Sequence, residues 1–226
     1  MTNQTEGLSI TVASGASELS PNQLSAKAWR AQLIAAAAVT SELRGVVAIA
    51  KEIALAAANA KAIAFRAGDK AKGFKPITDF INELAKETIG RADTINKLAI
   101  VLFHLTVEEY RKTTAYDKFK RVIKLSGAAD YAQSMQKPLD HAQIRMQDCH
   151  RQTKREVTLL LNQLEEVMNN ARTARIIATY SRIEASQAGE YLLSLQTVAE
   201  SVDNAAQIIH DNVQRCMIEL SQLTNK

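Results

Sequence analysis

The chain has 226 residues, with 28 Lys and Arg against 24 Asp and Glu and a net charge of +4. A chain of this length can bury its own hydrophobic core, so folding requires neither a metal nor a disulfide. Only three Pro and eight Gly interrupt a sequence rich in Ala, Leu, Glu, Lys and Gln, which predicts long helices. The cations alternate with anions instead of clustering beside aromatic residues, which does not favour nucleic acid as a partner.

The N-terminal region indicates a cytoplasmic protein. The first twenty residues are polar and have neither a basic start nor an apolar stretch, so no signal peptide is predicted. An Ala-rich run follows over residues 33–67. We predict no membrane span there, because four charged residues interrupt the run: Glu42, Arg44, Lys51 and Glu52.

The first helical hairpin is predicted over residues 20–125, after a disordered tail over residues 1–19. Ser20 and Pro21 suit the N-cap and the first position of a helix. Apolar residues then recur in steps of three and four, which indicates a coiled-coil seam. The ascending seam consists of Val39, Leu43, Val46, Ala50, Ile53, Ala57, Ala60, Ala64 and Ala67. The pattern stops at Gly68, so the chain should reverse over residues 68–74.

A descending helix should open near Pro76 and end near Leu125. Its seam contains one charged residue, Arg91, and otherwise keeps the same rhythm: Ile77, Ile81, Leu84, Thr88, Ile95, Leu98, Leu102 and Leu105. The polar stretch over residues 126–137 is predicted to be a linker.

The second hairpin is predicted over residues 138–226, with Pro138 in the first turn and the tip over residues 189–194. Its ascending seam consists of Leu160, Leu164, Val167, Ala171, Ala174, Ala178, Ser181, Ala185 and Ala188. The fold class is therefore all-α, an elongated antiparallel four-helix coiled-coil bundle made of two hairpins in one chain. The sequence leaves open whether the hairpins lie side by side or end to end.

The two ascending seams coincide when the chain is shifted by the 121 residues that bring Gly68 onto Gly189. Eight residues are then identical without a gap, which suggests a tandem duplication. They are Arg30, Leu43, Val46, Ala50, Ala57, Ala64, Ala67 and Gly68, paired with Arg151, Leu164, Val167, Ala171, Ala178, Ala185, Ala188 and Gly189. A shared heptad phase alone would also produce part of this agreement.

The first turn carries a more specific pattern. Within Glu52–Thr88, the motif RAGD at residues 66–69 is followed by KGF at residues 72–74 and LA at residues 84–85. This segment resembles the hairpin tip of the methyl-accepting chemotaxis receptor signalling domain. The second turn resembles the same tip more faintly, through IEA at residues 183–185 and AGE at residues 188–190.

The resemblance implies a non-enzymatic signal-transduction protein. Receptors of this family form four-helix bundles whose tips bind a histidine autokinase and a coupling adaptor, so the expected partners are a chemotaxis kinase, an adaptor or receptors. The chain could also assemble with copies of itself, and the sequence leaves monomer and dimer both open. The resemblance places partner contacts at Asn59, Arg66, Phe74 and Glu184. It places the turns at Gly68, Asp69, Gly73, Gly189 and Glu190.

Each tip keeps half of the Glu and Arg pair that is typical of the family. The first tip has Ile63 and Arg66, and the second has Glu184 and Gln187. The halves could complement one another across the bundle, or each tip could have decayed independently. Ala56 and Ala58 replace bulky apolar residues of the family tip, which puts control of a kinase in doubt.

Other chemistry finds little support in the sequence. The four histidines and the two cysteines, Cys149 and Cys216, have no metal-ligand spacing, so we expect free thiols, no metal and no cofactor. The basic run Lys118–Lys124 (KFKRVIK) is best explained as a solvated helix face, with phosphate or lipid binding as the alternative. A purely structural coiled coil is the second functional hypothesis. An enzyme is the third, and it would require a site assembled between the helices.

Overall fold

The computed structural model describes residues 21–127 and 132–224 as four long helices. They are α1 (Pro21–Ala67), α2 (Phe74–Ser126), α3 (Gln136–Ala185) and α4 (Leu192–Thr224). Short 3₁₀ segments lie at Gly68–Ala71, Ala132–Met135 and Gly189–Tyr191. The predicted tail over residues 1–19 and the centre of the predicted linker lie outside the described residues.

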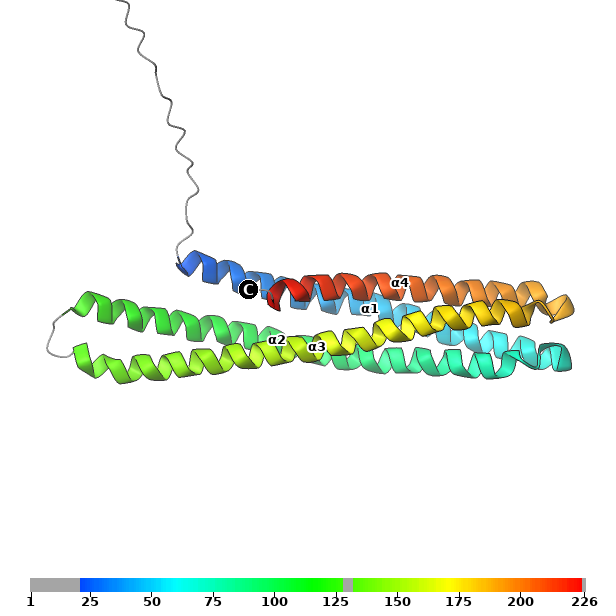
Figure 1. Cartoon of the computed structure of the whole chain (residues 1–226), viewed down its shortest axis with the longest axis horizontal. Coiled ribbons are helices and arrows are strands. Elements are labelled where there is room, and N and C mark those ends of the chain that lie inside the picture. The colour runs from blue at the N-terminus through cyan, green and yellow to red at the C-terminus, as the bar shows by residue number, and fades with distance from the viewer. Residues whose placement is uncertain (1–20, 128–131, 225–226) are drawn as a thin grey trace, which may run out of the picture.

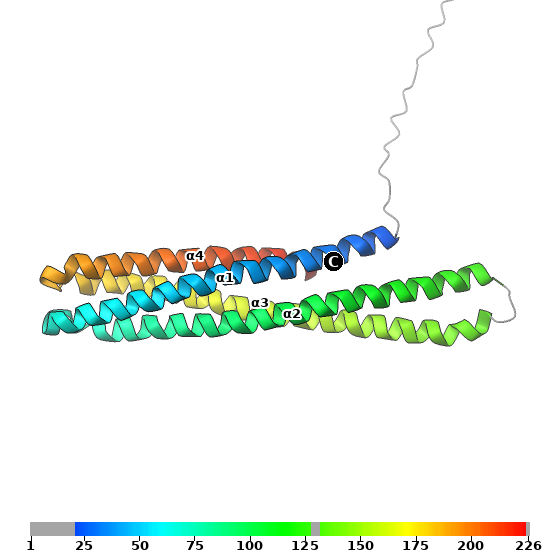
Figure 2. The ribbon, with the colours of Figure 1, turned by 180° about the vertical axis from the view of Figure 1, so that it is seen from behind.

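The helices form an elongated antiparallel four-helix bundle (Figure 1). Helices α1 and α2 make one hairpin, and α3 and α4 make the other. Each helix packs against two neighbours, in the cyclic order α1, α2, α3, α4. The two hairpins therefore lie side by side, with both of their turns at the same end of the rod (Figures 1 and 2).

The predicted seams form the core. All nine positions of the ascending seam on α1 are buried, and so are the corresponding nine positions at and just beyond α3. The core contains Leu, Ile and Val along most of its length and becomes Ala-rich toward the turns. Small side chains let neighbouring helix axes approach closely, so the bundle is narrow there and leaves little room for a cofactor between the helices.

The descending seam on α2 is buried except at Ile77 and Leu98, which are half-buried. The charged position in this seam, Arg91, is also half-buried, and its guanidinium lies at the edge of the core. It donates hydrogen bonds to Glu87 one turn away, at 2.7 and 3.0 Å, and to Gln163 on α3 at 3.4 Å. These partners explain how a cation is accommodated at a seam position.

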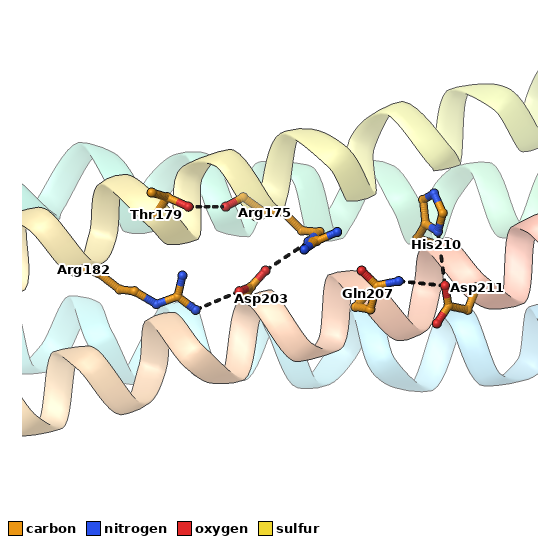
Figure 3. A network of polar contacts seen from close by, with 7 residues as sticks. All are labelled: Arg175, Thr179, Arg182, Asp203, Gln207, His210 and Asp211. Carbon is orange, nitrogen blue, oxygen red and sulfur yellow. Dashed lines mark hydrogen bonds and ion pairs between the residues drawn. The ribbon is translucent and has the colours of Figure 1, made fainter.

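Helices α3 and α4 are joined by a polar network centred on Asp203 (Figure 3). Arg182 donates to one carboxylate oxygen at 2.7 Å, and Arg175 donates to the other at 3.1 Å. The Arg182 hydrogen bond, together with that of Arg175, lowers the pKa of Asp203. About two turns further along α4, Asp211 accepts from Gln207 at 2.7 Å and contacts His210 at 3.2 Å. Among the described residues, the corresponding region of the first hairpin has the exposed pair of Lys61 and Asp79.

At the end of the rod opposite the turns, fewer helices pack together. Helices α2 and α3 continue past the end of α4 and past the described start of α1 (Figures 1 and 2). No residue of α2 after Thr106 is buried. We call this region, residues 107–127 and 132–150, the distal end.

Within the described part of the chain, the stretch Trp29–Ala71 is long and apolar enough by composition to cross a membrane. Its seam residues lie in the bundle core, and 33% of its most apolar window is buried.

Candidate partner-binding tip

The two turns have the same backbone geometry. Gly68 and Gly189, which correspond under the shift of 121 residues, both have φ of 58°. Each starts a short 3₁₀ segment that leads into the descending helix. A side chain at this φ would clash with the backbone, so the heptad seam ends where glycine permits the chain to reverse. We call the two turns with their flanking helix ends, residues 56–80 and 176–201, the tip.

A separate apolar cluster holds the tip together. Phe74 is fully buried, and so is Leu195, its counterpart under the shift. Both belong to one cluster with Ala60, Ala64, Ala67, Ala71, Ala185 and Ala188. The predicted contact role of Phe74 therefore needs correction, because its ring packs between the two turns and a partner cannot reach it in this conformation. The aromatic position of the motif is structural.

The two turns also interlock through polar residues. A Cβ built on Gly73 would overlap the carboxylate of Glu184, so the absence of a side chain lets that carboxylate lie against the start of α2. A carboxylate at a helix N-terminus is favoured by the helix dipole. In the opposite direction, the aliphatic stem of Lys70 reaches within 3.8 Å of a Cβ built on Gly189.

An apolar groove runs along the tip between α2 and α3, with a volume of about 600 Å³. Its lining residues are Gly73, Pro76, Ile77 and Phe80 from α2, and Ile177, Tyr180, Ile183 and Glu184 from α3. Tyr180 is 60% exposed and Ile183 is 55% exposed, although both are large and mostly apolar. Glu184 gives this groove a single negative charge at the end nearest the turns.

The predicted site residues do not form one surface. Asn59 and Arg66 are exposed on α1, seven residues apart and therefore on one face of that helix. Glu184 lies in the groove between α2 and α3, and Phe74 lies in the core. Among the ion pairs of the described residues, none joins Arg66 to Glu184, so the complementary arrangement of the two half-motifs is not formed. Asp69 and Glu190 are exposed in their turns.

Phe80, Tyr180 and Ile183 were not predicted as site residues. A trace of the groove was present in the sequence, because Ile177, Tyr180 and Ile183 follow one another at intervals of three residues outside the seam of their helix. The two walls of the groove, however, come from different hairpins. Only their side-by-side packing brings Phe80 opposite Tyr180 and Ile183.

The titratable groups of the described region form no cluster that could hold a metal ion. No group of three or more His, Cys, Asp or Glu residues with metal-binding geometry occurs in residues 21–127 and 132–224. Cys149 and Cys216 are both free thiols, and both are buried. Burial raises the pKa of Cys149 and raises that of Cys216 to about 12, which keeps both thiols protonated and unreactive.

Comparisons with known proteins add no relative. A scan of protein-family models finds no match to this chain, and searches of curated proteins and of solved structures find none either. The likeness to the chemotaxis receptor tip rests on the residues of the two turns alone.

Proposed function

We propose that this chain is a non-enzymatic, chemotaxis-type signalling protein that binds a protein partner through its tip. The observation that carries this proposal is the exposed apolar groove between α2 and α3, which adjoins the turn with the receptor-like motif. Large apolar side chains kept in solvent beside a well-packed core are typical of a protein-binding surface.

The groove suits one class of partner, an amphipathic helix with a basic residue. An open channel between two parallel walls accommodates the apolar face of a helix. Glu184 at the end of the channel would pair with a Lys or Arg of that helix, and the surrounding apolar side chains would strengthen this interaction by excluding water. A chemotaxis kinase, a coupling adaptor or a receptor is the partner that the turn motif favours.

The Ala-rich core gives a physical route for a signal. Small seam residues make slightly different helix packings close in energy, and the two groove walls belong to different hairpins. A small shift of one hairpin against the other would change the width of the groove. Partner affinity would then depend on the packing of the bundle.

The test is an affinity capture from the native cells with the wild type and with Ile183→Asp, followed by mass spectrometry. The matched control is Ile218→Asp on α4, because Ile218 is 51% exposed and lies far from the tip. We expect a chemotaxis kinase, adaptor or receptor with the wild type and the control, and loss of that partner with Ile183→Asp.

A third variant, Arg66→Glu, separates the two sides of the tip. Loss of the partner with Arg66→Glu but not with Ile183→Asp would move the contact from the groove to the exposed face of α1. If none of the baits captures such a partner while circular dichroism shows intact helices, the structural coiled-coil hypothesis takes precedence.

A further inference from the structure

The distal end concentrates the positive charge of the molecule. The distal end contains 8 Lys and Arg against 5 Asp and Glu, a net charge of +3 compared with +4 for the whole chain. Within this region, residues 111–124 at the end of α2 hold six cations and a single anion, Asp117.

Apolar residues share the same surface as these cations. Lys118, Arg121, Val122 and Leu125 are spaced i, i+3, i+4 and i+7, so they lie on one face of α2. All four side chains are exposed, Leu125 to 76% and Val122 to 48%. Lys120 and Lys124 are also exposed and flank this face. We call these six residues the distal face.

The cations of the distal face are not neutralised by the bundle. Lys118, Lys120, Arg121 and Lys124 appear in no ion pair of the described residues, whereas Lys97 and Lys112 earlier on α2 each pair with an acidic residue one turn away. The C-terminal end of the helix dipole stabilises cations in the last turn of a helix, and the effect fades beyond that turn. It can therefore explain only the cations in the last turn of α2. Lys120 lies over the Tyr116 ring at 5.9 Å, a contact that leaves its charge in place. The four cations therefore surround two exposed aliphatic residues without an anionic partner among the described residues.

We propose that the distal face docks the protein, end-on, against an anionic phospholipid membrane surface. Clustered Lys and Arg on a helix are attracted to anionic headgroups, and exposed aliphatic side chains between them can enter the boundary between headgroups and acyl chains. Val122 and Leu125 lie in the last turns of α2. This end of α2 extends past the end of α4 (Figure 1). A flat surface can reach this end without obstruction from α4.

Two other occupants fit the same surface less well. A second copy of this chain would bring the same positive charge against the distal face, which is unfavourable. Single-stranded nucleic acid binds through aromatic residues on which bases stack, but Tyr116 and Phe119, the aromatic residues beside this face, are both half-buried. The exposed side chains between the cations are aliphatic.

The docked orientation leaves the tip free. Helix α2 has 53 residues and so extends over about 80 Å at 1.5 Å per residue. Contact at the distal end would therefore hold the groove between α2 and α3 far from the membrane. This proposal stands on the charge and exposure of the distal end and does not depend on the partner of the tip.

The test is co-sedimentation of the full chain with vesicles of phosphatidylcholine alone or with about 30% phosphatidylserine, at about 0.1 M and 0.5 M salt. We expect binding only to the anionic vesicles and mainly at low salt. Reversing three cations, in Lys118→Glu with Arg121→Glu and Lys124→Glu, should weaken this binding by at least about a hundredfold, because each cation contributes roughly a factor of five.

The matched control reverses three exposed cations at the opposite end, Lys70→Glu with Lys72→Glu and Lys75→Glu, which produces the same change in net charge. These residues are accompanied by Asp69, Glu184 and Glu190, so we expect a loss of less than about tenfold. Equal losses in the two triple variants would overturn the proposal in favour of an effect of net charge. Tighter binding to duplex DNA or RNA than to anionic vesicles at equal salt would assign the distal face to nucleic acid instead.

A labelled variant, Leu125→Cys, tests contact of the aliphatic residues with the membrane. The native thiols are buried, so a polarity-sensitive dye attaches selectively to the new cysteine. A blue shift of its emission with anionic vesicles, abolished by the distal triple substitution, is the expected result. An unchanged emission spectrum on vesicles that bind the protein would show that Leu125 does not enter the bilayer.

Discussion

The two faces of the tip have the same core and different surfaces. Under the shift of 121 residues, the α2/α3 face corresponds to the α1/α4 face, and the burial patterns of residues 56–74 and 177–195 agree at 15 of 19 positions. The groove residues do not follow this symmetry. Phe80, Ile177, Tyr180 and Ile183 correspond to Ser201, Ala56, Asn59 and Ala62.

This comparison teaches that the packing of the tip and its surface are independent features. The seam positions must remain apolar and of fixed size in both hairpins, because they fill a common core. Positions outside the seam have no such requirement. The large apolar residues of the groove are therefore not demanded by the fold, and they indicate a binding surface. Phe65 and Leu193 are further exposed apolar residues of the tip, to 89% and 75%, and they lie outside the groove.

The largest effects on stability are expected at the equivalent core residues of the two turns, Phe74 and Leu195. Phe74→Ala should reduce the free energy of unfolding of the tip by about 3–5 kcal/mol, and Leu195→Ala by about 2–5 kcal/mol, because each leaves a cavity between the turns. Hydrogen exchange should show faster exchange in both turns for either variant and unchanged exchange near Leu102 and Leu160. An effect confined to the mutated turn would contradict a shared tip cluster.

The two turn glycines should respond alike. Gly68→Ala and Gly189→Ala should each cost about 1–2 kcal/mol, because both positions have φ of 58°. The control is Gly90→Ala, at an exposed position inside α2 where a Cβ meets nothing within 4 Å. That variant should stabilise the protein by about 0.5–1 kcal/mol in urea denaturation. If Gly68→Ala proved neutral, the positive φ of that turn would be in error.

Asp203 tests the difference between the hairpins. Asp203→Asn should cost about 1 kcal/mol at pH 7, since Asp203 is 25% exposed and is held by Arg182 and Arg175. Its pKa is lowered from 3.8 in the folded state, so the carboxylate stabilises the protein above that pH, and this contribution is lost as the pH falls through the lowered value.

The difference between wild type and Asp203→Asn in thermal melts should therefore shrink as the pH falls from 7 to about 3. The control is Asp79→Asn in the first hairpin, whose partner Lys61 is exposed. Because exposed pairs contribute little, that variant should change stability by less than about 0.5 kcal/mol. Equal effects of the two substitutions would remove the distinction between the hairpins.

The smallest expected effect is at the interlock between Gly73 and Glu184. Gly73 has φ of −68° and ψ of −18°, which alanine adopts without strain, so only the Glu184 carboxylate opposes a Cβ there. Gly73→Ala should be neutral or destabilising by less than about 1 kcal/mol in the wild type. In the Glu184→Ala background it should stabilise by about 0.5 kcal/mol, and a double-mutant cycle measures the coupling. Equal effects in the two backgrounds would show that the residues do not interact.

Much of the fold was predictable because it depends on local patterns. A run of apolar residues in steps of three and four places them on one side of a helix whatever that helix packs against. This spacing predicts the seams on α1 and α3. Gly68 and Gly189 predict the positions of the turns. Boundaries shifted by a few residues: α2 begins at Phe74, before Pro76, and the second turn closes by Leu192.

The site was less predictable. Motif matching placed the candidate site at the tip, where the groove also lies. It could not distinguish a side chain that faces outward from one that packs between the turns. Phe74 was therefore placed with exposed Arg66 although its ring is buried. Phe80, Ile177 and Tyr180 of the groove were missed because they belong neither to a predicted seam nor to the motif.

The sequence by itself determined four helices, their buried stripes and the places where the chain reverses, since each of these depends on residues close together along the chain. Only the tertiary structure decided that the hairpins lie side by side. That arrangement brings Phe80 of one hairpin opposite Tyr180 and Ile183 of the other, and it leaves the end of α2 uncovered by α4. The physical reason is that a helix seam specifies which side of a helix is buried, whereas the choice of neighbour depends on the fit between segments about a hundred residues apart.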